Sequence, residues 1–269
     1  MKLACSTWMM PGRDFSEKME KAAEYGFEGV EIRLFEEEAT QEKIKEIRGA
    51  LKSAGVTACS LIMPGETYRK PLLDEAAKRE KTELAKKAIA AAAEFHCPTI
   101  ICPEYGPQIP LPLFDHPRRP SAEQHRLLVD YLAAASEFAG QNGTQVMIEP
   151  INRYETRFFY TLADGRAVIE EVGSDHLFLL ADFFHMNIEE RDIPEAVRTG
   201  GERILHVHLG DSNRYLPGQG HTDFRGGFAA LREIGYDRFM ALECSIQGEP
   251  DTVLPQCAAY LRECQDGRG

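Results

Sequence analysis

Four side chains of the types that bind metal ions recur at near-even spacing through the second half of the chain. They are Glu149 in VMIEP, Asp182 in FLLADF, His208 in LHVHLG and Glu243 in FMALEC. Each stands at or near the end of a short apolar run that is typical of a buried strand. They lie roughly 30 residues apart, which is the length of one βα unit. Three carboxylates and one imidazole that converge on a point would form a divalent-metal site.

Such a donor set, with mostly oxygen ligands, favours Mn²⁺, with Co²⁺ and Mg²⁺ as alternatives. Structural Zn²⁺ prefers thiolate and imidazole ligands instead. A metal that accepts six ligands would keep open positions, which a carbonyl and an adjacent hydroxyl oxygen of a sugar would fill. The metal would then act as a Lewis acid, polarising the carbonyl and stabilising an enediolate. The sequence therefore predicts a metal cofactor and a small-molecule sugar substrate.

The elements that must position these residues alternate along the whole chain. Apolar runs read as buried strands at Lys2–Ser6, Gly29–Leu34, Thr57–Met63, Thr99–Pro103, Gln145–Glu149, Leu177–Asp182, Ile204–Leu209 and Phe239–Cys244. Helical patterns follow at Phe15–Tyr25, Gln41–Ala54, Asp74–Phe95, Ala122–Gln141, Ala163–Val172, Pro194–Gly201, Phe228–Ile234 and Thr252–Glu263. This alternation predicts an α/β protein, a single (β/α)8 TIM barrel that spans residues 1–269 as one domain. A doubly wound open sheet is the rival, but ACSTWMMPG after the first strand lacks GxGxxG.

The barrel makes a prediction about which way the acids point. Side chains alternate along a strand, so Met147 and Glu149 share one face, and the other face packs on helices. The acids then point inward at the carboxyl ends of the strands, where active sites of this fold lie. His206 and His208 share a face of the seventh strand. We interpret His208, nearer the carboxyl end, as the ligand and His206 as its supporting layer, a packed core histidine being an equal alternative for His206.

Composition narrows the class of partner. The chain has 43 acidic against 31 basic residues, a formal charge of −12, which argues against a nucleic-acid partner. No apolar run reaches the length of a membrane span, and no signal segment opens the chain. The seven cysteines contain no CxxC pair, so a reducing cytoplasm is the expected location.

Two loops bear on the rim of the expected site. Tyr105–Pro120 holds five prolines, so we expect an irregular lid or binding loop there. Ser245–Asp251, after the last strand, carries no Lys or Arg, so Arg214 is the one cation expected at the rim and a phosphorylated substrate is disfavoured. Gly218 and Gly220 in PGQG read as a plain turn.

Four motifs carry a family resemblance. They are EPINRYE at 149–155, ADFFH at 181–185, HVHLGDSNR at 206–214 and ALEC at 241–244. With them the chain resembles the sugar isomerase/epimerase branch of the xylose-isomerase-like barrels, and most of all the ketose 3-epimerases that act on D-tagatose and D-psicose. The match is strong over Gly143–Pro250, whereas the first half matches only as a general barrel pattern.

The resemblance implies roles for particular residues. Glu149, Asp182, His208 and Glu243 would hold the metal, and Glu149 and Glu243 would also be the acid/base pair that inverts C3 of a ketose through a cis-enediolate. Glu155, His185 and Arg214 would hold the first oxygens of the substrate. By analogy with such relatives, we expect a homo-oligomer, a dimer or tetramer.

Other functions use similar machinery and stay open at this point. An aldose–ketose or hydroxypyruvate isomerase would move the proton between C1 and C2. A dehydratase that acts on a keto-polyol, such as a keto-inositol or dehydroshikimate dehydratase, would share the metal and the base. An apurinic endonuclease barrel would need about three zinc ions and a basic face, which eight histidines and the charge of −12 disfavour. A non-enzymatic sugar-binding module would not need two glutamates around one metal.

Overall fold

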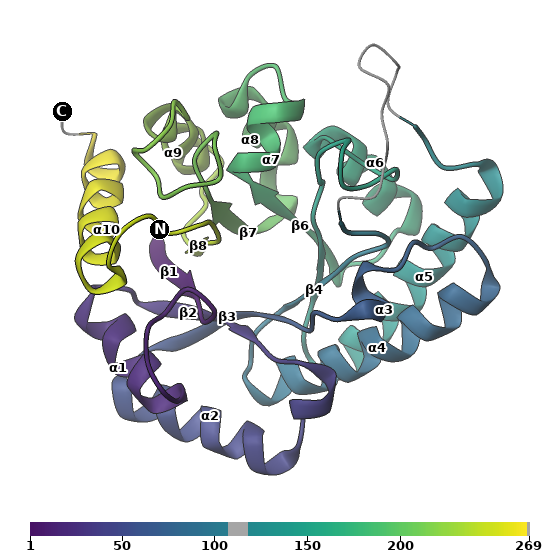
Figure 1. The fold of residues 1–269 in the computed structure, drawn as a ribbon. Helices are drawn as coiled ribbons and strands as arrows, with labels where there is room; N and C mark the ends of the chain where they lie inside the picture. The colour runs from purple at the N-terminus through teal and green to yellow at the C-terminus, as the bar shows by residue number, and fades with distance from the viewer. Residues whose placement is uncertain (107–117, 268–269) are drawn as a thin grey trace.

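The computed structural model describes residues 1–106 and 118–267. Within them, eight parallel strands form one closed barrel in chain order, with the last strand paired to the first. The strands are β1 Lys2–Ser6, β2 Gly29–Arg33, β3 Thr57–Ile62, β4 Thr99–Ile101, β5 Val146–Ile148, β6 Leu177–Asp182, β7 Ile204–Leu209 and β8 Phe239–Leu242. Figure 1 shows the helices arranged around the outside of these strands. The predicted TIM barrel is therefore confirmed.

The helices connect successive strands. They are α1 Phe15–Glu24, α2 Gln41–Ala54, α3 Glu66–Arg69, α4 Glu75–Glu94, α5 Ala122–Gln141, α6 Leu162–Val172, α7 Phe183–Glu189, α8 Ile193–Gly200, α9 Phe224–Glu233 and α10 Pro250–Asp266. Two 3₁₀ turns, η1 Glu36–Glu38 and η2 Gly201–Arg203, complete the described elements. None of the described helices is both long enough and apolar enough to cross a membrane.

Local capping explains where the predicted helices begin and end. The Ser121 hydroxyl accepts from the backbone N–H of Gln124, whose side chain accepts from the N–H of Ser121, so α5 starts with a capping box. Thr40 caps α2 in the same position, and Gly55 ends that helix in the left-handed conformation. These signals explain why both helices match their predicted bounds.

Three helices differ most from the sequence-based expectation. The short helices α3 and α7 were not predicted, because their few residues complete no apolar period. Helix α9 starts at Phe224 rather than Phe228. Asp223 caps its first turn, and Gly226 and Gly227 within that turn mask the helical pattern. The middle of the expected Tyr105–Pro120 loop lies outside the described residues.

The interior of the barrel is filled below the carboxyl ends of the strands. Ile100, Met147, Leu180 and Leu205 form one small buried cluster, and Ala4, Cys59 and Ala241 form another. Met147, Leu180 and Ala241 each precede by two positions one of the predicted metal ligands, so alternation places the ligands one layer higher. The floor of the site is therefore a packed apolar plug, as in other barrels of this kind.

Strand register brings the ligands level with one another. Asp182 in β6 pairs with His208 in β7, and His208 pairs with Ala241 in β8. The β2–β3 and β6–β7 ladders each shift register once, between Val30 and Glu31 in the first case. Such irregularities change the direction in which side chains point at the rim of a barrel.

Candidate active site

The four predicted metal ligands come together at the carboxyl end of the barrel. One side-chain atom from each of Glu149, Asp182, His208 and Glu243 lies within 4.8 Å of the others. His208 Nδ1 is central, at 3.6 Å from Glu149 Oε1, 3.8 Å from Asp182 Oδ2 and 3.4 Å from Glu243 Oε2. The first three side chains are buried, and Glu243 is partly exposed toward the cavity above.

Three of these atoms lack any hydrogen-bond partner. Glu149 Oε1, Asp182 Oδ2 and His208 Nδ1 are shielded from water and make no hydrogen bond with the described residues. Buried polar atoms are rarely left unpaired, because the lost hydration costs free energy. Three orphaned acceptors facing one point are what a cation would satisfy. The donor set of three carboxylates and one imidazole therefore fits a divalent ion chemically as well as geometrically.

Burial and mutual charge set the ionisation of these groups. Burial raises the pKa of Glu149 to about 8. Burial would also raise the pKa of Asp182, but the neighbouring imidazoles of His185 and His208 hold it well below its ordinary value. Burial opposes the protonation of His208, yet Glu31 and Glu243 outweigh it and raise the pKa of the imidazole. Glu149 and His208 thus favour their protonated forms, and a bound metal would have to displace those protons.

Asp182 is fixed from behind by the helix that follows it. Its Oδ1 accepts from the backbone N–H groups of Phe184 at 2.7 Å and His185 at 3.2 Å, which caps α7. Since one carboxylate oxygen is engaged in this way, only Oδ2 remains to face the metal position. The short α7 helix, which sequence reasoning missed, therefore orients a candidate ligand.

Glu31, which the sequence analysis did not single out, lies beneath His208. Its Oε2 is 2.8 Å from His208 Nε2, 2.7 Å from the donating Ser60 Oγ and 3.5 Å from His206 Nε2. The side chain of Glu31 is completely buried. The available signal was an acid within the apolar run GVEIR, at a position that alternation turns inward. His206 is buried beside this pair, with its ring centroid 5.3 Å from that of His208.

His185 points toward the same position from the side. Its Nδ1 lies 2.8 Å from the side-chain amide nitrogen of Asn152 and 3.3 Å from the backbone N–H of that residue. Nδ1 therefore accepts, and Nε2 carries the proton. That Nε2 lies 3.9 Å from both Glu149 Oε1 and Asp182 Oδ2 and has no hydrogen-bond partner among the described residues. It is free to donate to a ligand oxygen.

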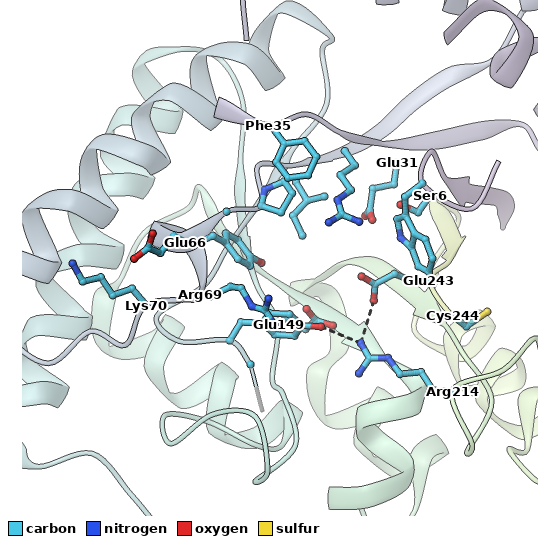
Figure 2. Close-up of a pocket in the computed structure, with 18 of the residues that line it drawn as sticks. Ser6, Glu31, Phe35, Glu66, Arg69, Lys70, Glu149, Arg214, Glu243 and Cys244 are labelled. Carbon is cyan, nitrogen blue, oxygen red and sulfur yellow. Dashed lines mark hydrogen bonds and ion pairs between the residues drawn. The ribbon is translucent and has the colours of Figure 1, made fainter. Parts of the chain in front are cut away.

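Arg214 and Glu155 lie together at the rim. Arg214 Nη1 is 3.2 Å from Glu155 Oε1, and its Nη2 is 3.8 Å from Glu243 Oε2 and 3.3 Å from the hydroxyl of Tyr105. Figure 2 shows Arg214 next to Glu243, with a dashed line that marks this ion pair. Arg214 has φ of 61°, a left-handed conformation uncommon for a non-glycine residue. The predicted substrate-holding residues thus surround the predicted metal site.

The loop that carries Arg214 is built around Asp211. The Asp211 Oδ2 accepts from the backbone N–H groups of Gly218 and Gly220, each at 2.8 Å, and its Oδ1 accepts from Ser212 and Thr222. Because this carboxylate occupies those amides, PGQG is a turn, as predicted, and not a phosphate cradle.

A cavity of about 960 Å³ opens above the site. Glu31, Glu149, Glu243 and Arg214 are among the residues that line it, and Trp8 and Phe35 contribute aromatic surface. Arg33, Arg69 and Lys70 also line it, so the expectation that Arg214 alone would serve the rim was wrong. Arg33 follows Glu31 by two positions on the inward face of β2, and the other two cations come from the unpredicted α3 and the residue after it.

Comparisons with known proteins agree with the barrel fold. The family described as "Xylose isomerase-like TIM barrel" matches residues 19–264. A 3-dehydro-D-guloside 4-epimerase from Escherichia coli is 28% identical over 267 residues, which cover 98% of this chain and 100% of the relative. A D-psicose 3-epimerase from Agrobacterium fabrum is 28% identical over 233 residues, 85% of this chain and 78% of the relative. The crystal structure of an E. coli 3-keto-D-glucoside 4-epimerase, in its apo form, superimposes with a TM-score of 0.86 at 28% identity, covering 98% of this chain and 100% of that one.

Proposed function

The chain belongs to the xylose isomerase-like TIM barrel family, and we propose that it is a divalent-metal-dependent epimerase acting on a keto sugar. The observation that carries the proposal is the set of orphaned buried atoms on Glu149, Asp182 and His208, with Glu243 beside them. Relatives of this chain are named as sugar epimerases, which supports the same reaction class. A non-enzymatic sugar-binding module would not need two glutamates at a buried metal site.

Inversion of a carbon next to a carbonyl requires removal of its proton from one face and return of a proton to the other. Glu149 follows β5 and Glu243 follows β8, so the two carboxyl groups reach the ligand position from different sides of the barrel mouth. We propose that one removes the proton and the other supplies it. General acid–base work of this kind contributes about 10²–10⁴-fold to the rate.

The remaining residues hold the substrate during this exchange. A divalent ion bound by Glu149, Asp182, His208 and Glu243 would supply Lewis acidity to the carbonyl; the oxygen-rich donors favour Mn²⁺. His185 Nε2 and Arg214 are placed to donate to sugar oxygens, and Glu155 accepts from Arg214 and can accept from a hydroxyl. These contacts would keep the ketose from rotating within the site while the carbon that has lost its proton is planar.

The reacting carbon has two candidates. The notable motifs EPINRYE and HVHLGDSNR favour C3 of a free ketose, as in the D-psicose 3-epimerases. The relative that matches nearly the whole chain over its own full length is a 3-dehydro-D-guloside 4-epimerase, which favours C4 of a 3-keto glycoside. Both carbons lie next to a carbonyl, so the same pair of glutamates would serve either reaction.

Proton–deuterium exchange tests the proposal and chooses between these carbons. Mn²⁺-loaded protein in D₂O would be incubated with D-fructose, D-psicose, D-tagatose, L-ribulose, hydroxypyruvate and a methyl 3-keto-glucoside, and followed by NMR. Deuterium at C3 with the inverted ketose identifies a 3-epimerase, and deuterium at C4 of the glycoside identifies a 4-epimerase. Label confined to C1 or C2 would establish an aldose–ketose isomerase instead, and loss of water would establish a dehydratase.

A substitution at Glu243 tests the two-glutamate mechanism. Glu243→Gln should lower kcat by about 10²–10⁴-fold, because it removes one acid/base group. Glu249→Gln makes the same chemical change at an exposed residue without a side-chain cap hydrogen bond, and should have no effect. Full activity in Glu243→Gln would refute the two-glutamate mechanism.

A further inference from the structure

Arg33 lines the cavity and has no acidic partner among the described residues. Its Nε is shielded from water and donates no hydrogen bond to the described residues, and no carboxylate lies in ion-pair contact with its guanidinium. The guanidinium carbon lies 5.2 Å from the centroid of the Phe35 ring, and the backbone N–H of Arg33 donates to Thr7 Oγ1. Shielding a charged donor without a partner costs free energy, which an anionic ligand would recover.

Arg69 lines the same cavity and is likewise without an acidic partner in the described part of the chain. Its guanidinium carbon lies 6.0 Å from the ring centroid of Tyr105, and it passes close to Gly106, where an added Cβ would lie 3.4 Å from Arg69 Nε. A guanidinium is the side chain best suited to bind carboxylate or phosphate through paired N–H groups.

The other two cations of the cavity are already engaged. Arg214 lies against Glu155 and Glu243, and Lys70 pairs with Glu80 at 2.7 Å. Glu66 also lines the outer cavity but is in ion-pair contact with neither Arg33 nor Arg69. Figure 2 shows Glu66 and Lys70 on the side of the cavity away from Glu243 and Cys244. Among the described residues that line the cavity, Arg33 and Arg69 are therefore the cations without an acidic partner.

The cavity has room for more than the reacting part of a sugar. A volume of about 960 Å³ is near the upper end of the range for small-molecule sites, about 300–1,000 Å³. Trp8 is 43% exposed and, with Phe35, adds aromatic surface to the lining of the cavity. A substrate anchored at the metal position thus has room within the same cavity to extend toward the two arginines.

We propose that Arg33 and Arg69 form a subsite for an anionic group, a carboxylate or a phosphate, at the end of the keto-sugar substrate remote from the reacting carbons. The inference rests on the proposed function for the identity of the sugar part and deepens it by naming an acidic substrate class. It reverses the expectation from the sequence that phosphorylated substrates are disfavoured.

Equilibrium binding to the Mn²⁺-loaded protein, measured by calorimetry, tests the subsite without reference to turnover. The probes are D-fructose, D-fructose 6-phosphate and D-fructuronate, which differ only in the group at C6. We expect the phosphate or the carboxylate to bind at least about 10-fold more tightly than the neutral sugar, as one charge-assisted hydrogen bond provides. The stronger of the two anions identifies the source of the charge. Equal affinity for all three probes would overturn the proposal.

Arginine variants assign the preference to the two side chains. Arg33→Gln and Arg69→Gln should each reduce the ratio of anionic to neutral affinity by about 10-fold. Arg69 is exposed, so its variant keeps the fold even if Arg33→Gln does not. The matched control is Arg48→Gln on α2, which removes an equal charge from an exposed pair with Glu94 and should leave the ratio unchanged. A ratio unaffected by both cavity variants would refute the subsite.

The experiments distinguish a failure of the proposed epimerase function from a failure of the proposed anion subsite. Deuterium exchange at C3 or C4 with no preference for the anionic probes would leave the epimerase standing and remove the subsite. An arginine-dependent anion preference without exchange of any substrate carbon would leave the subsite standing and remove the proposed reaction. Raising the KCl concentration should weaken the preference for the anions and leave D-fructose binding unchanged, since salt screens exposed charges.

Discussion

Glu31 Oε2 and His208 Nε2 lie 2.8 Å apart, both fully buried, so the carboxylate holds the imidazole from below. Because this hydrogen bond holds a proton on Nε2, the other ring nitrogen, Nδ1, which faces Glu149, Asp182 and Glu243, would give its lone pair to a bound metal once it is deprotonated. Carboxylate–histidine pairs of this kind orient metal ligands and raise their basicity.

Glu31→Gln should therefore weaken metal binding by about 10- to 100-fold, the usual effect of losing such a supporting group. Calorimetric titration with Mn²⁺ measures the affinity directly, and the d–d spectrum of the Co²⁺-loaded variant reports a changed ligand field that a purely structural defect would not produce. Glu37→Gln, at an exposed glutamate in η1, is the control. Unaltered Mn²⁺ affinity in Glu31→Gln would show that His208 is oriented by other contacts.

Metal binding should release protons. Burial raises the pKa of Glu149 from its ordinary 4.5 to about 8, and Glu31 and Glu243 overcome burial to raise the pKa of His208, so both groups favour the protonated form without metal. Both must be deprotonated to become ligands, so we expect metal binding at pH 7 to release protons. Calorimetry in buffers of different ionisation enthalpy counts them. No proton release would contradict this account of the site.

The same pKa shifts give the metal-free protein a characteristic pH dependence. A carboxyl group whose pKa is raised in the folded state stabilises that state below its unfolded value and loses this contribution as pH rises through the folded value. For Glu149 the stabilisation is present below about pH 4.5 and lost by about pH 8. The melting temperature of chelated protein should fall across this interval, whereas Mn²⁺-loaded protein should not follow it. A parallel fall in both forms would assign the effect to other groups.

Asp211 should be a stability residue as well as a support for Arg214. It accepts four backbone N–H groups, and although burial opposes ionisation, these donors keep its pKa below the ordinary value. Asp211→Asn replaces an acceptor by a donor facing those amides, so we expect a loss of about 2–4 kcal/mol in urea unfolding. Since the Arg214 N–H donates to the Asp211 carbonyl, KM for the sugar should rise too. A fully stable variant would contradict the reading of this loop.

Lys81 organises the wall of the cavity from behind. Its Nζ is almost fully buried and donates to the backbone carbonyls of Thr67 at 3.0 Å, Tyr68 at 2.8 Å and Cys102 at 3.1 Å. Lys81→Met keeps the aliphatic length and leaves three carbonyls unpaired, so it should cost about 2–4 kcal/mol of unfolding free energy. Lys86→Met, on the exposed face of the same helix, should cost less than about 0.5 kcal/mol. Equal unfolding midpoints for the two variants would refute the role.

The sequence predicted the barrel and its four candidate ligands because both follow from local periodicity. Asp182 and His208 end regular apolar runs, and alternation alone decides which face they occupy. Glu31 and Arg33 were not predicted as site residues. They lie in a strand that reads as buried, and only barrel closure shows that its inward face opens onto the cavity. Arg69 was not predicted because α3 has too few residues for a helical period.

The pairing of β1 with β8 has a consequence for how the polypeptide acquires its structure during synthesis. Lys2 pairs with Phe239 and Cys5 with Leu242, so the two edges that seal the barrel come from opposite ends of the chain. Until β8 has left the ribosome, β1 keeps an unpaired edge, and such edges invite association with other chains. Glu243 follows directly after β8, so the candidate metal site is completed in the same step that seals the barrel. Manganese uptake by an emerging or refolding chain would therefore report ring closure itself.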